Sequence, residues 1–139
     1  MLSLETVKQY LRIDLDDFDT EIESMILGAE SYFSKETNHV FGKVEKEYFE
    51  PFRIYDFPVH DTEGLKRKNN YYIPVNCPTT ESITVEVGYE NEENIPADIV
   101  ECLLQIIKVW YYESENEQNS TLLPMSVKQV IQKNKRFYF

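Results

Sequence analysis

The sequence predicts a mainly helical α+β fold: a small bundle of about four helices with a small antiparallel β-hairpin or sheet inserted between the second and third. Apolar residues recur every three to four positions through residues 17–37 and again through residues 95–118, which is typical of helices. Residues 40–94 instead contain several prolines and a run that alternates apolar and polar side chains, residues 83–87, which favours strands and turns. The 139 residues are enough for one domain, residues 1–139, with a modest core.

Residues 1–38 predict the first two helices. Ser3 is placed to cap a short helix whose apolar stripe is Leu4, Val7 and Leu11. A second helix is expected over residues 17–37, with Asn38 as its stop. Its apolar stripe consists of Phe18, Ile22, Met25, Ile26, Ala29 and Phe33. A glycine inside a helix costs about 1 kcal/mol relative to alanine; a close neighbouring backbone would explain Gly28, but the sequence does not show one.

Residues 40–94 predict the β insertion. Strands are expected at residues 44–49, 71–75 and 83–87, and the last of these ends at Gly88. Residues 61–70 are polar and carry the run Lys66, Arg67 and Lys68, which is typical of an exposed loop or hairpin tip. The aromatic residues between positions 48 and 57 either form a core around the sheet or provide a contact surface, and the sequence favours neither.

Residues 95–118 predict a long apolar helix that begins near Pro96. Its inner stripe is Ile99, Leu103, Ile106 and Trp110, and Val100, Leu104 and Ile107 widen that stripe. A helix this apolar must be covered on more than one side, either by its own domain or by another subunit. Residues 122–139 predict a short helix after Pro124, with Val127, Val130 and Ile131 facing inward, and then a basic tail.

The net charge of −11 disfavours tight DNA binding by most of the surface, because phosphate contacts require Lys and Arg. The charges are unevenly distributed: residues 1–30 hold eight acidic and two basic side chains, and residues 118–139 hold four basic and no acidic ones. The acidic region and the basic tail are therefore suited to pairing between neighbouring copies. We also expect no membrane span, since no apolar run approaches about 18 residues.

The sharpest candidate for chemistry is the cluster Asp14, Asp16, Asp17 and Asp19. Clustered carboxylates bind hard cations, but Asp19 and Met25 stand where a calcium loop needs Gly and Glu. A helix start with solvated acids is the favoured interpretation, so no metal site is predicted. Likewise, His39 and His60 are expected at the surface, Cys77 and Cys102 are expected to be free thiols, and Cys102 is expected in the core. We predict no cofactor and no catalytic residue.

Two terminal patterns resemble the head–tail connector, or adaptor, proteins of tailed bacteriophages, which are also labelled DNA-packaging proteins. The first pattern is Leu4, Val7, Lys8, Leu11, Arg12, Asp19, Ile22, Ile26, Ala29 and Tyr32. The second is Pro96, Ile99, Leu103, Trp110, Tyr111, Leu123, Pro124, Val127, Val130 and Ile131. Tyr112, Ser114 and Ser126 depart from the family pattern, and the middle of the chain is longer and more aromatic than is usual there.

This resemblance implies a structural, non-enzymatic subunit that forms a ring of about twelve copies under the portal protein. The ring would extend the DNA channel, with DNA only as passing cargo, and would dock the next stopper or head-completion protein. It would be found in the virion neck and, during assembly, in the host bacterial cytoplasm, with no membrane partner. The expected oligomer or partner contacts are Val100, Leu104, Ile107, Trp110, Tyr111, Lys133, Lys135 and Arg136. The expected channel-facing loop is Lys66, Arg67 and Lys68.

Two alternatives remain open at this point. One is a metal-dependent nuclease or phosphatase that uses the cluster Asp14, Asp16, Asp17 and Asp19. The other is a monomeric module that binds another protein through the central aromatic residues.

Overall fold

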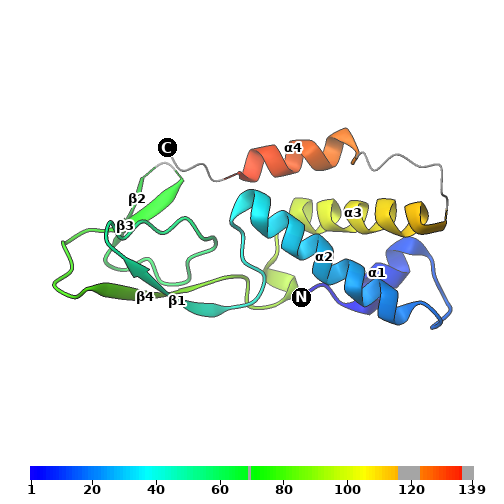
Figure 1. The fold of residues 1–139 in the computed structure, drawn as a ribbon, viewed down its shortest axis with the longest axis horizontal. Helices are drawn as coiled ribbons and strands as arrows, with labels where there is room; N and C mark the ends of the chain where they lie inside the picture. The colour runs from blue at the N-terminus through cyan, green and yellow to red at the C-terminus, as the bar shows by residue number, and fades with distance from the viewer. Residues whose placement is uncertain (69, 116–122, 136–139) are drawn as a thin grey trace.

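The helices and strands occupy opposite halves of an elongated molecule, which a computed structural model describes for residues 1–68, 70–115 and 123–135 (Figure 1). The helices are α1 (Leu4–Leu11), α2 (Asp19–Thr37), α3 (Ala97–Glu115) and α4 (Met125–Asn134). The strands are β1 (Val44–Phe49), β2 (Leu65–Lys68), β3 (Tyr71–Pro74) and β4 (Ser82–Val87). A short 3-10 turn, η1 (Glu92–Asn94), leads into α3. The predicted α+β class, with the strands inserted between the second and third helices, is confirmed.

The ends of the first two helices follow local capping chemistry. The hydroxyl of Ser3 accepts a hydrogen bond from the Thr6 amide at 3.1 Å, which caps α1 as predicted. Asn38 ends α2 in the left-handed conformation, also as predicted. However, α2 begins at Asp19 rather than at residue 17, and its N-cap Phe18 makes no side-chain capping hydrogen bond.

The hydrophobic core lies within the helical half. α3 packs against α1, α2 and α4, and the buried stripes of all four helices meet around it. Gly28 on α2 faces the Trp110 ring on α3, where an added Cβ would lie 3.3 Å from Cζ3. The close neighbour that explains Gly28 is therefore a side chain rather than a backbone.

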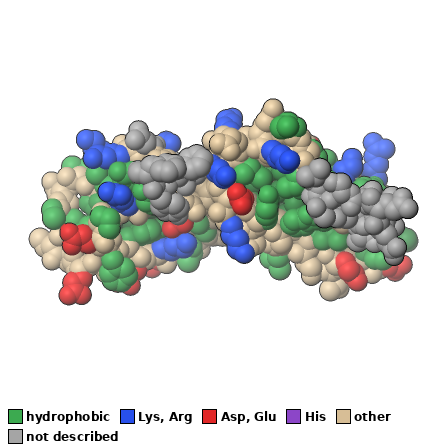
Figure 2. Space-filling model, turned by 45° about the horizontal axis from the view of Figure 1, so that its top comes forward, with side chains coloured by type: hydrophobic (Ala, Val, Ile, Leu, Met, Phe, Trp, Pro, Cys, Tyr) green, Lys and Arg blue, Asp and Glu red, His purple; other side chains and the backbone are tan. Residues whose placement is uncertain are grey.

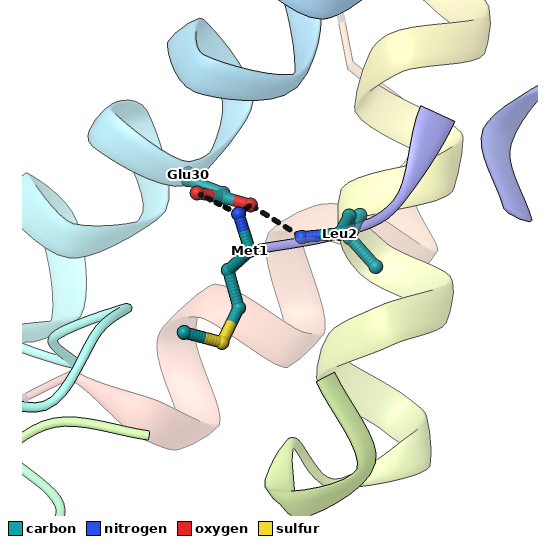
Figure 3. A network of polar contacts seen from close by, with 3 residues as sticks. All are labelled: Met1, Leu2 and Glu30. Carbon is teal, nitrogen blue, oxygen red and sulfur yellow. Dashed lines mark hydrogen bonds and ion pairs between the residues drawn. The ribbon is translucent and has the colours of Figure 1, made fainter. Parts of the chain in front are cut away.

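A buried carboxylate ties the first residues of the chain to α2 (Figure 3). Glu30 accepts a hydrogen bond from the Leu2 amide at 2.8 Å, and the Met1 amino group lies 3.0 Å from the same oxygen, Oε1. Glu30 is buried, so these two donors compensate for the loss of water around its charge.

The β half consists of two separate antiparallel ribbons, β1–β4 and β2–β3. The predicted strands at 44–49, 71–75 and 83–87 correspond to β1, β3 and β4. The run Lys66, Arg67 and Lys68 is exposed and lies in β2, paired with β3 beside the hairpin turn, so of the two predicted settings the hairpin is found and the loop is not. An isolated bridge between Ile54 and Tyr72 connects the irregular segment after β1 to the β2–β3 ribbon.

Aromatic rings join the two halves. His39 lies 5.6 Å from Phe33 of α2 and 4.8 Å from Phe57 between ring centroids. Its Nδ1 is 2.9 Å from the Tyr89 hydroxyl, and only 2% of the residue is exposed. The prediction that His39 lies at the surface is therefore wrong, because the β insertion folds back over the end of α2.

Candidate interaction surfaces

The apolar α3 is covered largely by its own chain. Leu104 and Ile107, two of the expected contacts to other subunits, are only 6% and 0% exposed. Val100, Trp110 and Tyr111 are half-buried at the edge of the same core. Between the two explanations for such an apolar helix, the structure favours coverage within the subunit. Leu104 and Ile107 are thus not available to a second copy, and their assignment as contact residues is corrected.

The last turns of α3 carry an aromatic cluster that remains partly exposed. Tyr32 of α2 packs edge-on against Trp110, with ring centroids 6.5 Å apart. Tyr111 packs edge-on against Tyr112 at 5.4 Å, and Tyr112 is exposed. Large aromatic side chains that keep an exposed edge are suited to protein contacts. Trp110 and Tyr111 therefore remain candidate contact residues.

Two basic runs that lie far apart in the sequence meet where β2 approaches the end of α4. Arg67 of β2 and Lys133 and Lys135 at the end of α4 line one hollow of about 280 Å³, together with His39, Phe57, Asn70 and Asn134. Figure 2 shows Lys and Arg side chains gathered along the upper side of the β half. The sequence did not predict this meeting, because no local spacing relates residue 67 to residue 133. Arg136, the other predicted basic contact, lies outside the described residues.

Acidic side chains of the same subunit partly balance this basic cluster. Lys133 Nζ lies 3.8 Å from Asp98 Oδ2, and Lys135 Nζ lies 3.7 Å from Glu36 Oε2. Such solvent-exposed pairs contribute little to stability and can be exchanged for a partner's carboxylate or phosphate. Lys66 and Lys68, on either side of Arg67, are exposed. The cluster is therefore suited to electrostatic docking of an acidic partner.

The acidic cluster before α2 is organised around a lysine. Lys8 Nζ lies 2.7 Å from Asp16 Oδ1 and 2.9 Å from Asp19 Oδ1. These hydrogen bonds hold the pKa of Asp16 below its usual value and raise the pKa of Lys8. An ammonium group thus occupies the position between the carboxylates that a cation would take. Over the described residues, no group of three or more His, Cys, Asp or Glu side chains is arranged to hold a metal ion.

The remaining candidate groups for chemistry are His60 and the two cysteines. His60 is exposed, as predicted, and its Nε2 is in hydrogen-bonding contact with the Gly88 carbonyl. Both cysteines are free thiols, as predicted; Cys77 is exposed and Cys102 is buried in the core. Burial raises the pKa of Cys102 to about 12, so its thiol stays protonated.

Within the described part of the chain, no helix is long and apolar enough to cross a bilayer.

Comparison with known proteins gives two matches. The family described as "Phage gp6-like head-tail connector protein" matches residues 1–135. A chain from a solved structure titled "Virion of native gene transfer agent (GTA) particle" superimposes with a TM-score of 0.69 at 12% sequence identity. That superposition covers 99% of this chain and 91% of the other, and at this identity it shows a shared fold. No curated protein matches the sequence.

Proposed function

Since the chain belongs to the family of phage gp6-like head–tail connector proteins, we propose that it assembles into a ring beneath the portal of a tailed phage or prophage. The ring extends the DNA channel and docks the next stopper or head-completion protein. The observation that carries this proposal is the family match, which reaches from residue 1 to residue 135 and so includes the helices and the β insertion.

The charge distribution supports a role in which DNA passes without being held. A subunit with a net charge of −11 repels phosphates over most of its surface, so DNA can slide through an acidic ring. The basic cluster of Arg67, Lys133 and Lys135 is local and partly paired. We assign it to protein docking, where an acidic patch on another subunit or on the portal completes its charge balance.

The proposed neighbours are sister copies, about twelve in a closed ring, with the portal on one side and the stopper protein on the other. Trp110 and Tyr111 provide the aromatic contacts, and Lys133 and Lys135 the charged ones. The protein acts in the virion neck, after assembly in the host bacterial cytoplasm. No step of this function requires covalent chemistry, since it depends on self-association and docking.

Co-assembly with the portal protein of the same phage tests this proposal. Negative-stain images of the purified complex should show an annulus of this protein on one face of the portal. A preparation in which the portal rings carry no bound connector, at concentrations where both proteins are folded, would overturn it.

A charge-reversed variant tests the docking role of the basic cluster. Lys133→Glu with Lys135→Glu should reduce incorporation into the complex, because the acidic partner surface would then be repelled. Lys128→Glu, on the exposed side of the same helix α4, serves as the matched control and should assemble normally.

A further inference from the structure

The two ends of the long axis both expose large apolar side chains. At the end of the helical half, the connection between α1 and α2 carries Leu15, 63% exposed, and Phe18, 46% exposed. At the end of the β half, Phe49 closes β1 at 61% exposed and Val75 follows β3 at 60%. Figure 1 shows that the α1–α2 connection and the β ribbons lie at opposite ends of the molecule. None of these four side chains is buried in the hydrophobic core around α3.

The helical end is acidic. Asp14 and Asp17 flank Leu15 and Phe18 in sequence, and both carboxylates are exposed. Lys8 is engaged with Asp16 and Asp19, and no ion pair between Asp14 or Asp17 and a described cation is present. Two apolar side chains surrounded by carboxylates therefore protrude from this end; we refer to residues 14–18 as the acidic knob.

The β end contains a hollow with apolar walls and basic side chains, which complements the acidic knob. Its volume is about 330 Å³, and its walls include Tyr71, Pro74 and Pro78. Two cations line it, Arg53 and Lys68, against one carboxylate, Glu50. The guanidinium carbon of Arg53 lies 5.5 Å from the centre of the Tyr71 ring, so this cation is held over an aromatic wall. We refer to this hollow as the basic cup; Phe49 and Val75 adjoin its lining residues Glu50 and Pro74.

We propose that the acidic knob of one subunit inserts into the basic cup of the next copy in the ring. Leu15 and Phe18 pack against the tyrosine and proline walls, and Asp14 and Asp17 pair with Arg53 and Lys68. The occupant is a second copy because the knob offers both the apolar side chains and the opposite charge that the cup requires. This contact joins two different surfaces of one subunit, which is the arrangement that a cyclic ring uses. The inference rests on the ring proposed above.

Cross-linking through a native thiol tests this contact. Cys77 is exposed and lines the basic cup, so a cysteine placed on the acidic knob should reach it from the neighbouring copy. In portal-bound rings carrying Leu15→Cys, a short bis-maleimide should produce a ladder of cross-linked multimers. The knob and the cup lie at opposite ends of one subunit, so a bond within one chain cannot give this product.

Two controls define the result. Leu27→Cys on α2 is 66% exposed, as accessible as Leu15, and should remain uncross-linked. Adding Cys77→Ser to the Leu15→Cys variant should abolish the ladder. Rings that form normally but give no Leu15→Cys ladder would overturn the contact and leave the ring in place. Equal cross-linking of Leu27→Cys would also overturn it, and a failure of any ring to form would remove both proposals.

A charge exchange provides an independent readout. Asp17→Lys alone and Lys68→Glu alone should each weaken ring assembly about tenfold, because each places like charges together. The double variant should restore assembly to near the parent level. Two single variants whose effects simply add in the double variant would contradict the pairing.

Discussion

The helical half and the β half differ in how their buried apolar side chains are organised. Four helices enclose a continuous core, in which Ile22, Phe33 and Ile106 are fully buried. The two ribbons have only two strands each, and a two-stranded ribbon cannot cover both of its faces. The buried side chains of the β half, Phe52, Ile54 and Val87, lie outside the continuous core, and Phe49 on β1 is exposed. This difference indicates that the bundle supplies stability and that the ribbons supply surface for contacts.

The largest expected effect comes from making the same substitution, phenylalanine to alanine, once in each half. Phe33→Ala should lower the free energy of unfolding by about 3–5 kcal/mol, because it leaves a cavity in the closed core. Phe49→Ala, on the exposed face of β1, should change it by less than about 0.5 kcal/mol. Urea denaturation followed by circular dichroism measures both. Similar losses would show that the ribbons are as well packed as the bundle.

Replacing Glu30, the buried carboxylate of α2, should have the next largest effect on stability. Glu30→Ala should cost about 1–3 kcal/mol of stability, because the Leu2 amide would lose its buried acceptor. Glu23→Ala, an exposed position on the same helix, is the matched control and should be nearly neutral. Equal thermal unfolding curves for the two variants would mean that water replaces Glu30 without loss.

The aromatic junction determines whether the halves unfold together. Tyr89→Phe removes the hydroxyl that contacts His39 and should cost about 1 kcal/mol. Trp110, the only tryptophan, reports on the bundle by fluorescence, and hydrogen exchange at the β1–β4 amides reports on the ribbons. We expect the two transitions to move apart in Tyr89→Phe but to remain coincident in Tyr112→Phe, whose side chain is exposed. Coincident transitions in both variants would contradict a coupling role for this contact.

The smallest effect is expected at the acidic knob. The hydrogen bond from Lys8 holds the pKa of Asp16 below its usual value, so the ionised carboxylate favours the folded state at neutral pH. That contribution is lost as the pH falls through the lowered pKa. Asp16→Asn should therefore unfold slightly more easily than the parent at pH 7 and equally easily in strong acid. A difference that persists in acid would point to a cause other than this charge.

The sequence was most informative where spacing along the chain is itself the cause of the structure. The apolar stripe of Ile22, Ile26 and Phe33 predicted α2, and the alternation at residues 83–87 predicted β4. The capping chemistry of Ser3 and Asn38 placed two helix ends. The start of α2 was misplaced by two residues, because residues 17 and 18 form a turn and the helix begins at Asp19.

The candidate surfaces were predicted less well, since each depends on residues that are distant in the sequence. Lys66–Lys68 and Lys133–Lys135 were identified as basic runs, but their meeting at one hollow follows from the β2–β3 hairpin reaching the end of α4. The cation Arg53 was not singled out at all. Only its position over Tyr71 distinguishes it, and no periodic signal marks that contact.

By itself, the sequence determined the helices, the strands, the charge imbalance and the resemblance to connector proteins, because these depend on the order of neighbouring residues. Only the tertiary structure decided that Leu104 and Ile107 are covered within the subunit and that His39 is buried. It also decided that Arg53 and Lys68 line one hollow of the β half and that Leu15 and Phe18 stay exposed in the helical half. The physical reason is that burial and charge pairing depend on which segments meet in space, and no local spacing specifies that meeting.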